Sequence, residues 1–289
     1  MKVCFIAIIG RPNVGKSSLM NAILDYDLSI ISPKPQTTRD QILGIYNDGD
    51  YQFVFTDTPG IHKAESQFGE VLNDKSYKSF KEIDLVLFLQ PADEEISVGD
   101  NFVIDKIVNQ KNKLAVITKI DKISDPKIIE EKALFLKEKK FDAVLGTSIS
   151  ITQSVDSLIN EIKKYSYESV PFYDLDDITD KSSSFIAKET IREAAINLLK
   201  EELPHAIVIE INEYKESEEE DEISATIYVQ KDSQKGILIG AGGTMIKAIG
   251  TAARLNLSKK FDKNIKLWTK VKVQKNWTND VKQIKKFGY

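Results

Sequence analysis

The first two-thirds of the chain alternates between short apolar runs and stretches with the hydrophobic period of a helix. Apolar runs rich in β-branched residues, such as Val3–Ile9 and Leu114–Ile117, are typical of buried parallel strands. Because strands alternate with helices, the pattern predicts an α/β domain with a mostly parallel sheet, helices on both faces, and ligands at the carboxyl ends of the strands. The other expected strands are Gln41–Tyr46, Tyr51–Phe55, Leu85–Leu89 and Ala143–Leu145, and the expected helices are Ser17–Leu24, 67–80, 97–110, 126–139 and 153–165.

The pattern breaks at residues 166–184, where a proline, four aspartates and a serine cluster form a composition typical of a linker. We therefore divide the chain into a first domain of residues 1–167, a linker of 168–184 and a compact α+β domain of 185–289. In this second domain we expect a helix at Phe185–Leu199, strands at Ala206–Asn212, Ile223–Val229 and Ile265–Val273, and an acidic turn at Glu216–Glu222.

The composition fits a soluble protein of two domains. The chain has 289 residues, of which 42% are hydrophobic and 29% charged, and no apolar run reaches the length of a membrane span. The N-terminal apolar stretch is too short for a secretory signal. The single cysteine, Cys4, lies in an apolar run, and we expect a buried, inert thiol in a cytoplasmic protein.

Charge is distributed unevenly along the chain. Residues 231–289 contain 14 Lys and Arg against three Asp, a net charge of +11, and the remaining residues carry −15. Such an asymmetry indicates a basic module that meets a polyanion, although a solvated lysine surface would give the same count.

Gly10–Ser17, GRPNVGKS, matches the P-loop pattern G-x-x-x-x-G-K-[ST] between an expected strand and an expected helix. Backbone N–H groups of such a loop, together with the helix N-terminus, cradle phosphates. Lys16 should contact the β- and γ-phosphates, and the Ser17 hydroxyl should ligate Mg²⁺. The expected loop contacts are Gly10, Asn13, Val14, Gly15 and Ser18.

Three further motifs follow strands of the same domain. In Asp57-Thr-Pro-Gly60, the carboxylate can hold Mg²⁺ and the Gly60 N–H can sense the γ-phosphate. In Thr118-Lys119-Ile120-Asp121, the carboxylate can accept the guanine N1–H and N2–H₂ donors, which adenine lacks, while the Lys119 stem covers the ring. Ser148-Ile149-Ser150 can offer a backbone N–H to guanine O6.

Four glycines fall within eight residues at Gly236–Gly243, between short apolar segments. A dinucleotide fingerprint is disfavoured because Met245 occupies its third glycine position. Two helical segments joined at Gly240-Ala-Gly-Gly243 instead fit the G-x-x-G loop of a KH domain, which clamps a single-stranded nucleic-acid backbone. The expected RNA contacts are Lys235, Gly240, Ala241, Gly242, Gly243, Lys247 and Arg254. Trp277 is either a core anchor or a base-stacking platform.

These motifs, with Gln36-Thr-Thr-Arg-Asp40 and Asp57-Thr-Pro-Gly-Ile-His62, resemble the bacterial Era group of Ras-like GTPases. The resemblance continues at Thr179–Ser182, Ile246–Arg254 and Val271–Trp277 of a type II KH domain. It implies a slow, Mg²⁺-dependent GTPase that binds the 3′ end of 16S ribosomal RNA as a monomer and assists maturation of the small (30S) subunit. Switch segments would be Ile31–Asp40 and Asp57–Gln67.

The resemblance also assigns individual roles. Thr38 would close over Mg²⁺, with Thr37 as the alternative, and Asn13 would contact a bound K⁺. The expected catalytic residues are Lys16, Thr38, Asp57 and Gly60; Ile61 replaces a water-orienting glutamine, and His62 would have a structural or switch role.

The chain departs from the family pattern at three positions. Thr118 replaces the usual asparagine, Ile149 the usual alanine, and Ala241 a frequent lysine. Two other classes of function stay open, namely a P-loop phosphotransferase or ATPase, and a regulatory GTPase peripheral to the inner face of the cell membrane.

Overall fold

The described chain forms two compact units. The computed structural model describes all residues except 33, 35–36, 60–67, 73–82 and 201–202. The boundary between the units falls after Asp180, within the segment predicted as a linker. The first unit comprises Met1–Ser29, Thr38–Lys63 and Leu72–Asp180, and the second comprises Ile30–Thr37, Ala64–Val71 and Lys181–Tyr289.

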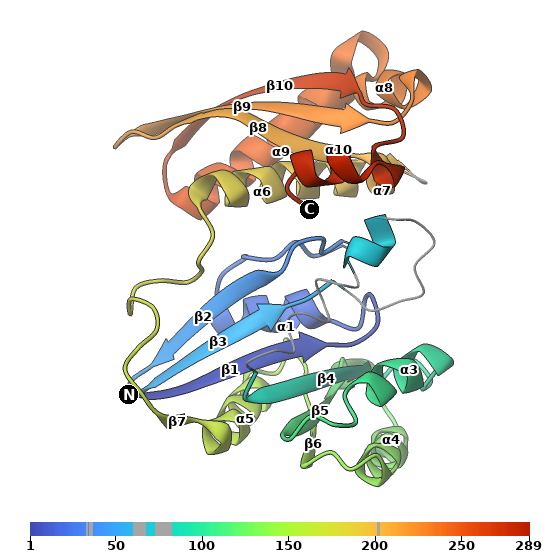
Figure 1. Ribbon diagram of the computed structural model, residues 1–289, viewed down its shortest axis with the longest axis vertical. Coiled ribbons are helices and arrows are strands. Elements are labelled where there is room, and N and C mark those ends of the chain that lie inside the picture. Colours follow the sequence, from blue (N-terminus) through green and yellow to red (C-terminus); the bar gives the residue numbers. More distant parts are fainter. Residues whose placement is uncertain (33, 35–36, 60–67, 73–82, 201–202) are drawn as a thin grey trace. The chain divides into compact units, whose positions relative to one another are not determined.

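The first unit is built on a sheet with the strand order β2-β3-β1-β4-β5-β6 (Figure 1). The five strands from β3 to β6 in this order are parallel to one another, and the edge strand β2 is antiparallel to β3. The predicted, mostly parallel sheet is therefore confirmed. The strands are β1 (Lys2–Ile9), β2 (Ile42–Asp48), β3 (Tyr51–Asp57), β4 (Leu85–Pro91), β5 (Lys113–Thr118) and β6 (Ala143–Gly146).

Both faces of this sheet are covered. On one face, Ala7 of β1 and Phe88 of β4 pack with residues of two helices, α3 and α4, in a buried core. The alternate residues, such as Ile8 and Leu87, point to the opposite face and are also fully buried. The helices of this unit are α1 (Lys16–Leu24), α3 (Val98–Lys106), α4 (Pro126–Glu138) and α5 (Thr152–Ile162).

The predicted helix at 97–110 is too long. It begins where Ser97 and Asp100 form a capping box and ends at Lys106. Residues 109–112 are all polar or charged, so another turn would bury no apolar surface. Of the predicted helix 67–80, the described residues 68–72 are helical, and the rest lies outside the described residues.

The segment after α5 is anchored along the first unit. A short strand, β7 (Tyr167–Glu168), pairs antiparallel with β1. The fully buried side chain of Gln52 then accepts hydrogen bonds from the backbone N–H groups of Phe172 (2.7 Å) and Tyr173 (3.1 Å) and donates to the Tyr173 carbonyl (2.9 Å). One glutamine thus replaces a strand partner for this stretch.

The second unit is a three-stranded sheet with the order β10-β9-β8, packed on one face by helices α6 and α9. Its apolar core joins Ile191 of α6, Ile227 of β9 and Leu257 of α9. The elements are α6 (Ser183–Leu198), α7 (Leu203–Ala206), β8 (Val208–Lys215), β9 (Glu220–Val229), α8 (Asp232–Ile239), α9 (Thr244–Phe261), β10 (Asn264–Val273) and α10 (Val281–Lys286).

Two predicted boundaries in this unit are wrong. The strand predicted from Ala206 begins at Val208, because Leu203–Ala206 form a helical turn. The acidic turn is shorter than predicted, since β9 already begins at Glu220. Lys266 of the neighbouring strand β10 pairs with Glu220 at 2.5 Å and Glu222 at 3.8 Å, and this cation lets the acidic residues enter the sheet.

Trp277 is a core anchor. Its side chain is fully buried, and its indole N–H donates to the carbonyl of Ala206 at 3.0 Å. Phe287 packs edge-on against it, with 5.7 Å between ring centroids. The stacking role for Trp277 is therefore excluded, since a base cannot reach this ring.

Among the described helices, none is by itself long and apolar enough to cross a membrane. The α8 helix and the segment Ala241–Phe261 meet that criterion together, by length and composition, with a bend of 42° between them.

We expect Gln52→Leu to destabilise the first unit. The change leaves three backbone groups of Phe172 and Tyr173 without partners, so the free energy of unfolding should fall by about 2–3 kcal/mol. Urea unfolding measures this loss, and limited proteolysis should cut faster near Phe172. Asn47→Ala removes an exposed hydrogen bond to the Leu175 carbonyl and the bond that Asn47 Oδ1 accepts from Gln52 Nε2 (3.0 Å), but it leaves the bonds of Gln52 to Phe172 and Tyr173 in place and should cost about 1 kcal/mol. Equal stability of Gln52→Leu and the wild type would contradict the anchoring role.

Candidate guanine-nucleotide site and G-x-x-G loop

The P-loop has the backbone geometry that phosphate binding requires. Gly10 and Gly15 have φ angles of +152° and +100°, and Gly15 caps the start of α1. A Cβ at Gly10 would lie 2.9 Å from the Leu89 carbonyl oxygen, so glycine is needed there for packing as well. Asn13, at φ +65°, completes the turn. The N–H groups of this loop and of α1 can therefore surround an anion.

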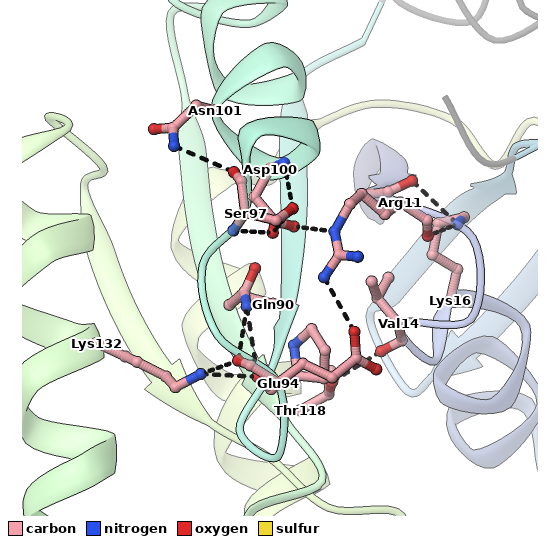
Figure 2. A network of polar contacts seen from close by, with 12 residues as sticks. Arg11, Val14, Lys16, Gln90, Glu94, Ser97, Asp100, Asn101, Thr118 and Lys132 are labelled. Atoms are coloured by element: carbon pink, nitrogen blue, oxygen red, sulfur yellow. Dashed lines mark hydrogen bonds and ion pairs between the residues drawn. The ribbon is translucent and has the colours of Figure 1, made fainter. Parts of the chain in front are cut away.

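Lys16 is a buried cation held by the loop itself. Its Nζ donates to the carbonyls of Gly10 (3.1 Å) and Arg11 (2.7 Å), as Figure 2 shows. Burial lowers the pKa of Lys16 to about 8, although the nearby Asp57 acts in the opposite direction. The charged form gains most when phosphates arrive beside it.

Three oxygen ligands meet at the start of α1. The Ser17 hydroxyl donates to Asp57 Oδ2 at 2.7 Å and lies 3.1 Å from Thr38 Oγ1. The Thr37 hydroxyl instead donates to the Lys34 carbonyl at 2.6 Å. The structure therefore places Thr38, rather than Thr37, with the other two expected ligands.

This set of oxygens fits Mg²⁺. Asp57 is fully buried, and among the described residues its Oδ1 has no hydrogen-bond partner. Burial raises its pKa, which indicates that the charged form is costly without a cation close by. Two hydroxyls and one carboxylate are hard ligands that suit Mg²⁺ with water and phosphate oxygens. Within the described ranges no group of three or more His, Cys, Asp or Glu residues could hold another metal.

The guanine motifs line one cavity of about 250 Å³. The Thr118 hydroxyl donates to the Val14 carbonyl at 2.8 Å, so the residue that replaces the family's asparagine still ties this loop to the P-loop. Lys119 has a left-handed backbone, at φ +57°. The cavity is lined by Gly15, Ser18, Leu19, Thr118, Lys119, Asp121, Lys122, Thr147, Ser148, Ile149 and Ser150.

The loop after β6 presents one backbone donor. Ser148 N donates to Ser154 Oγ (3.0 Å), and Ser150 N donates to Ser148 Oγ (3.1 Å). No acceptor is recorded for Ile149 N among the described residues, so this N–H suits guanine O6. The Ile149 side chain is 56% exposed, so the larger residue fits by facing solvent.

Gly60, Ile61 and His62 lie outside the described residues. Their expected roles at the γ-phosphate and in the switch stay predictions.

In the second unit, Gly240–Gly243 joins α8 to α9 as a single tight turn, as predicted. Gly240, Gly242 and Gly243 have φ angles of +74°, +57° and +82°. A Cβ at Gly240 would lie 2.8 Å from Met245 N, whereas one at Gly242 or Gly243 would meet nothing within 4 Å. Gly240 is therefore required by packing, while the two later glycines leave open space in front of the α9 N-terminus.

The expected basic contacts surround this turn. Lys247 lies in the first turns of α9 and is exposed, and Arg254 is exposed seven residues further on, on the same side of the helix. Lys235, on α8, is partly buried, and Ala241 is exposed without a charge to offer. A nucleic-acid backbone could therefore meet two helix ends and three cations.

Sequence analysis missed three charged residues beside the nucleotide loops, namely Arg11, Glu94 and Asp100. Arg11 forms ion pairs with both acids. The available signal was the acidic run at Asp93–Glu95, which follows β4 at the sheet edge where ligands bind.

The P-loop, the Mg²⁺ oxygens and the guanine cavity, followed by a G-x-x-G turn between helices, define a GTPase with a C-terminal KH domain. Residues 5–119 match a family model described as "50S ribosome-binding GTPase", and residues 202–278 match a KH domain model.

Similar proteins specify the family. The chain is 56% identical over 291 residues to the GTPase Era of Mycoplasmopsis pulmonis, with 99% of each chain covered. It is 38% identical to that of a Thermoanaerobacter species, covering 100% of this chain and 96% of the relative. The chain therefore belongs to the Era family of GTPases.

Two solved structures match over the whole chain. One is Era in complex with MgGDPNP and nucleotides 1506–1542 of 16S ribosomal RNA, with a TM-score of 0.93 and 34% identity. The other is an Aquifex aeolicus Era variant bound to GDP and AlF₄⁻, with the same TM-score and identity. Each covers 100% of this chain, and this chain covers 99% of each.

We expect GDP affinity to fall above pH 8. Phosphates favour charged Lys16 and raise its pKa in the complex above the value of about 8 in the free protein. Below pH 8 the lysine is already protonated and affinity should be flat. Above pH 8 binding must take up a proton, so affinity should be about five- to tenfold lower at pH 8.8 than at pH 7.

Titration with a fluorescent GDP analogue measures this change. Calorimetry at pH 8.5 in two buffers of different ionisation enthalpy should reveal the proton uptake. Lys16→Arg, which does not titrate in this range, is the control if it still binds GDP. Equal binding enthalpies of the wild type in both buffers would refute the assignment.

Proposed function

We propose that this GTPase binds the 3′ end of 16S ribosomal RNA under control of its guanine nucleotide and assists assembly of the small ribosomal subunit. The observation that carries the proposal is the G-x-x-G turn, with the exposed cations Lys247 and Arg254 beside it, in the same chain as a P-loop and a guanine cavity. The relative bound to nucleotides 1506–1542 supports this choice of RNA.

In the first unit, each side chain has a defined role. Lys16 leaves two backbone carbonyls to meet the β- and γ-phosphates, and Asp121 accepts the two guanine donors. Ser17, Thr38 and Asp57 would hold Mg²⁺, which neutralises charge that develops on the phosphates.

Thr38 and Asp57 also link chemistry to conformation. Each lies in one of the expected switch segments, and both approach Ser17. GTP holds the two segments at the start of α1, and loss of the γ-phosphate releases them. Hydrolysis is slow because Ile61 has no group that can orient water.

In the second unit, the backbone of the turn and the α9 N-terminus receive phosphates. Gly242 and Gly243 let the RNA backbone approach closely, and Lys235, Lys247 and Arg254 supply salt-dependent attraction. Since Ala241 provides no charge, these three carry more of it than in relatives with lysine at that position.

K⁺ is a further cofactor in this proposal. Asn13 is exposed on the P-loop in a left-handed conformation, where its amide oxygen can help to hold a monovalent ion beside the phosphates. A cation there would partly replace the arginine that other GTPases use to stabilise the transition state.

We expect GTP hydrolysis to be faster in KCl than in NaCl at equal ionic strength, by about tenfold or more, because K⁺ held beside the phosphates would stabilise the negative charge that develops in the transition state. Steady-state phosphate release measures the rates. Asn13→Gly removes the amide and tolerates the left-handed backbone at φ +65°, so hydrolysis by this variant should be equally fast in the two salts and match the wild-type rate in NaCl. Equal rates in the two salts would exclude K⁺ as a cofactor but leave the GTPase assignment intact.

We expect Gly242→Asp to weaken RNA binding by about tenfold or more, because the carboxylate faces incoming phosphates. Gly242→Asn is the matched control: both residues tolerate the left-handed backbone at φ +57°, and both Cβ atoms enter open space. The affinity of the neutral variant Gly242→Asn for RNA should therefore fall by less than about threefold. Lys247→Gln should lower the salt slope by about one phosphate contact.

Filter binding to RNA from the 16S 3′ end, at several KCl concentrations, measures these effects, with GDP affinity as a check on folding. If Gly242→Asp binds this RNA as tightly as the wild type, the turn is not the clamp. Binding to anionic vesicles but not to RNA would favour a membrane-peripheral GTPase instead.

The proposal places the protein in the cytoplasm. Cys4 is fully buried and burial raises its pKa, so the thiol stays protonated and unreactive, as suits a reducing compartment.

A further inference from the structure

The connection between β4 and α3, Ala92–Ser97, carries three consecutive acids that belong to none of the nucleotide motifs. Figure 2 shows Glu94 extending from this connection to Arg11 of the P-loop. Its two carboxylate oxygens contact different partners, one from each nucleotide-binding loop.

Glu94 Oε2 lies 3.0 Å from Arg11 Nη2. The Nε of the same guanidinium donates to Asp100 Oδ1 at 2.7 Å, and the Asp100 carboxylate is fully buried, where Ser97 N and Oγ also donate to it. A Cβ at Gly99 would lie 2.7 Å from Arg11 Cδ, so the arginine stem lies directly against the start of α3.

Arg11 is itself a P-loop residue, so the contacts of its side chain restrain the loop. Its own carbonyl accepts the hydrogen bond from Lys16 Nζ at 2.7 Å. The anchored guanidinium thus restrains the backbone at the residue whose carbonyl meets Lys16 in the ligand-free protein.

Glu94 Oε1 lies 3.5 Å from Lys119 Nζ, the lysine of the guanine loop. Asp93 assists, with Oδ1 at 3.6 Å from Lys119 Nζ and Oδ2 at 2.9 Å from Lys122 Nζ. The Lys119 stem must lie along the guanine ring, and these acids hold the end of that stem.

The Glu94 backbone is itself anchored. Its carbonyl accepts hydrogen bonds from Gln90 Nε2 at 3.3 Å and from Nζ of Lys132, a buried residue of α4 (Figure 2). Lys132 also donates to the Pro91 carbonyl at 3.2 Å. The acidic connection is therefore anchored to the sheet and to α4, and this rigid backbone allows Glu94 to position residues of both loops.

We propose that Glu94 is a positioning residue that couples the phosphate loop to the guanine loop, one carboxylate oxygen holding Arg11 and the other holding Lys119. Guanine that orders Lys119 then also orders Arg11 and, through it, the P-loop backbone that cradles the phosphates, so base and phosphate contacts strengthen each other. The side chain touches neither base nor phosphate; it acts through the two cations.

The test compares Glu94→Gln with Glu95→Gln. Both remove one negative charge from adjacent positions, but Glu95 is exposed and takes part in no ion pair recorded for the described residues. Glu94, Arg11 and Lys119 have side chains 40%, 23% and 25% exposed, so each bridge is partly screened by solvent. We expect Glu94→Gln to weaken GDP binding about three- to tenfold through faster release, and Glu95→Gln less than about 1.5-fold.

A kinetic split distinguishes positioning from general damage. KM for GTP should rise with the GDP dissociation constant, whereas kcat at saturating GTP and the Tm of the nucleotide-free protein should match those of Glu95→Gln. GDP affinity of Glu94→Gln equal to that of Glu95→Gln would overturn the proposal. A loss of GDP affinity accompanied by a Tm clearly below that of Glu95→Gln would also overturn it, since general destabilisation of the first unit would then explain the weaker binding.

A double-mutant cycle tests the coupling itself. Arg11→Met and Lys119→Met each remove one partner of Glu94. Their effects on GDP affinity should be non-additive by about threefold or more in the wild-type background, and additive when Glu94→Gln is also present. Additivity in both backgrounds would show that the two loops act independently and would also overturn the proposal.

Discussion

A phosphate can meet several backbone N–H groups at once only where no side chain stands in front of them. Both sites of this chain satisfy this constraint with glycines at the start of a helix, Gly10 and Gly15 before α1 and Gly240–Gly243 before α9. The positive φ angles turn the N–H groups toward one side, and each helix N-terminus adds a partial positive charge. The same physical solution thus serves a nucleotide in one unit and a nucleic-acid backbone in the other.

The two buried charges at the first loop have polar partners in the free protein and gain opposite charges when the nucleotide and Mg²⁺ bind. Lys16 rests on two carbonyls, and Asp57 is buried beside two hydroxyls, with its pKa raised by burial. Within the part of the chain that the structure describes, neither charge has a full counter-charge at hydrogen-bond distance. Triphosphate and Mg²⁺ supply these opposite charges, which is why binding them can draw Thr38 and Asp57 together at the same helix end.

The acids outside the motifs have a different task. Asp100 lies fully buried at the start of α3, and its capping role there makes it a rigid acceptor for Arg11. Glu94 extends the same support to Lys119. The nucleotide loops thus depend on a connection that contacts neither base nor phosphate, and the rigidity of that connection comes from Lys132 and from the sheet beneath it.

What the sequence determined by itself is local. The periods of apolar residues located the main strands and helices of both units but not the short elements β7, α7 and α10. The glycine, lysine and aspartate motifs located the P-loop and the G-x-x-G turn, because backbone conformation and phosphate chemistry depend on residues close together in the chain. Tertiary structure decided the rest. Arg11 and Glu94 are 83 residues apart in the chain, and Gln52 and Phe172 are 120 apart. No local sequence pattern can therefore predict either contact. The burial of Trp277 and the choice of Thr38 over Thr37 beside Ser17 likewise required three dimensions, since each depends on which atoms approach from distant segments.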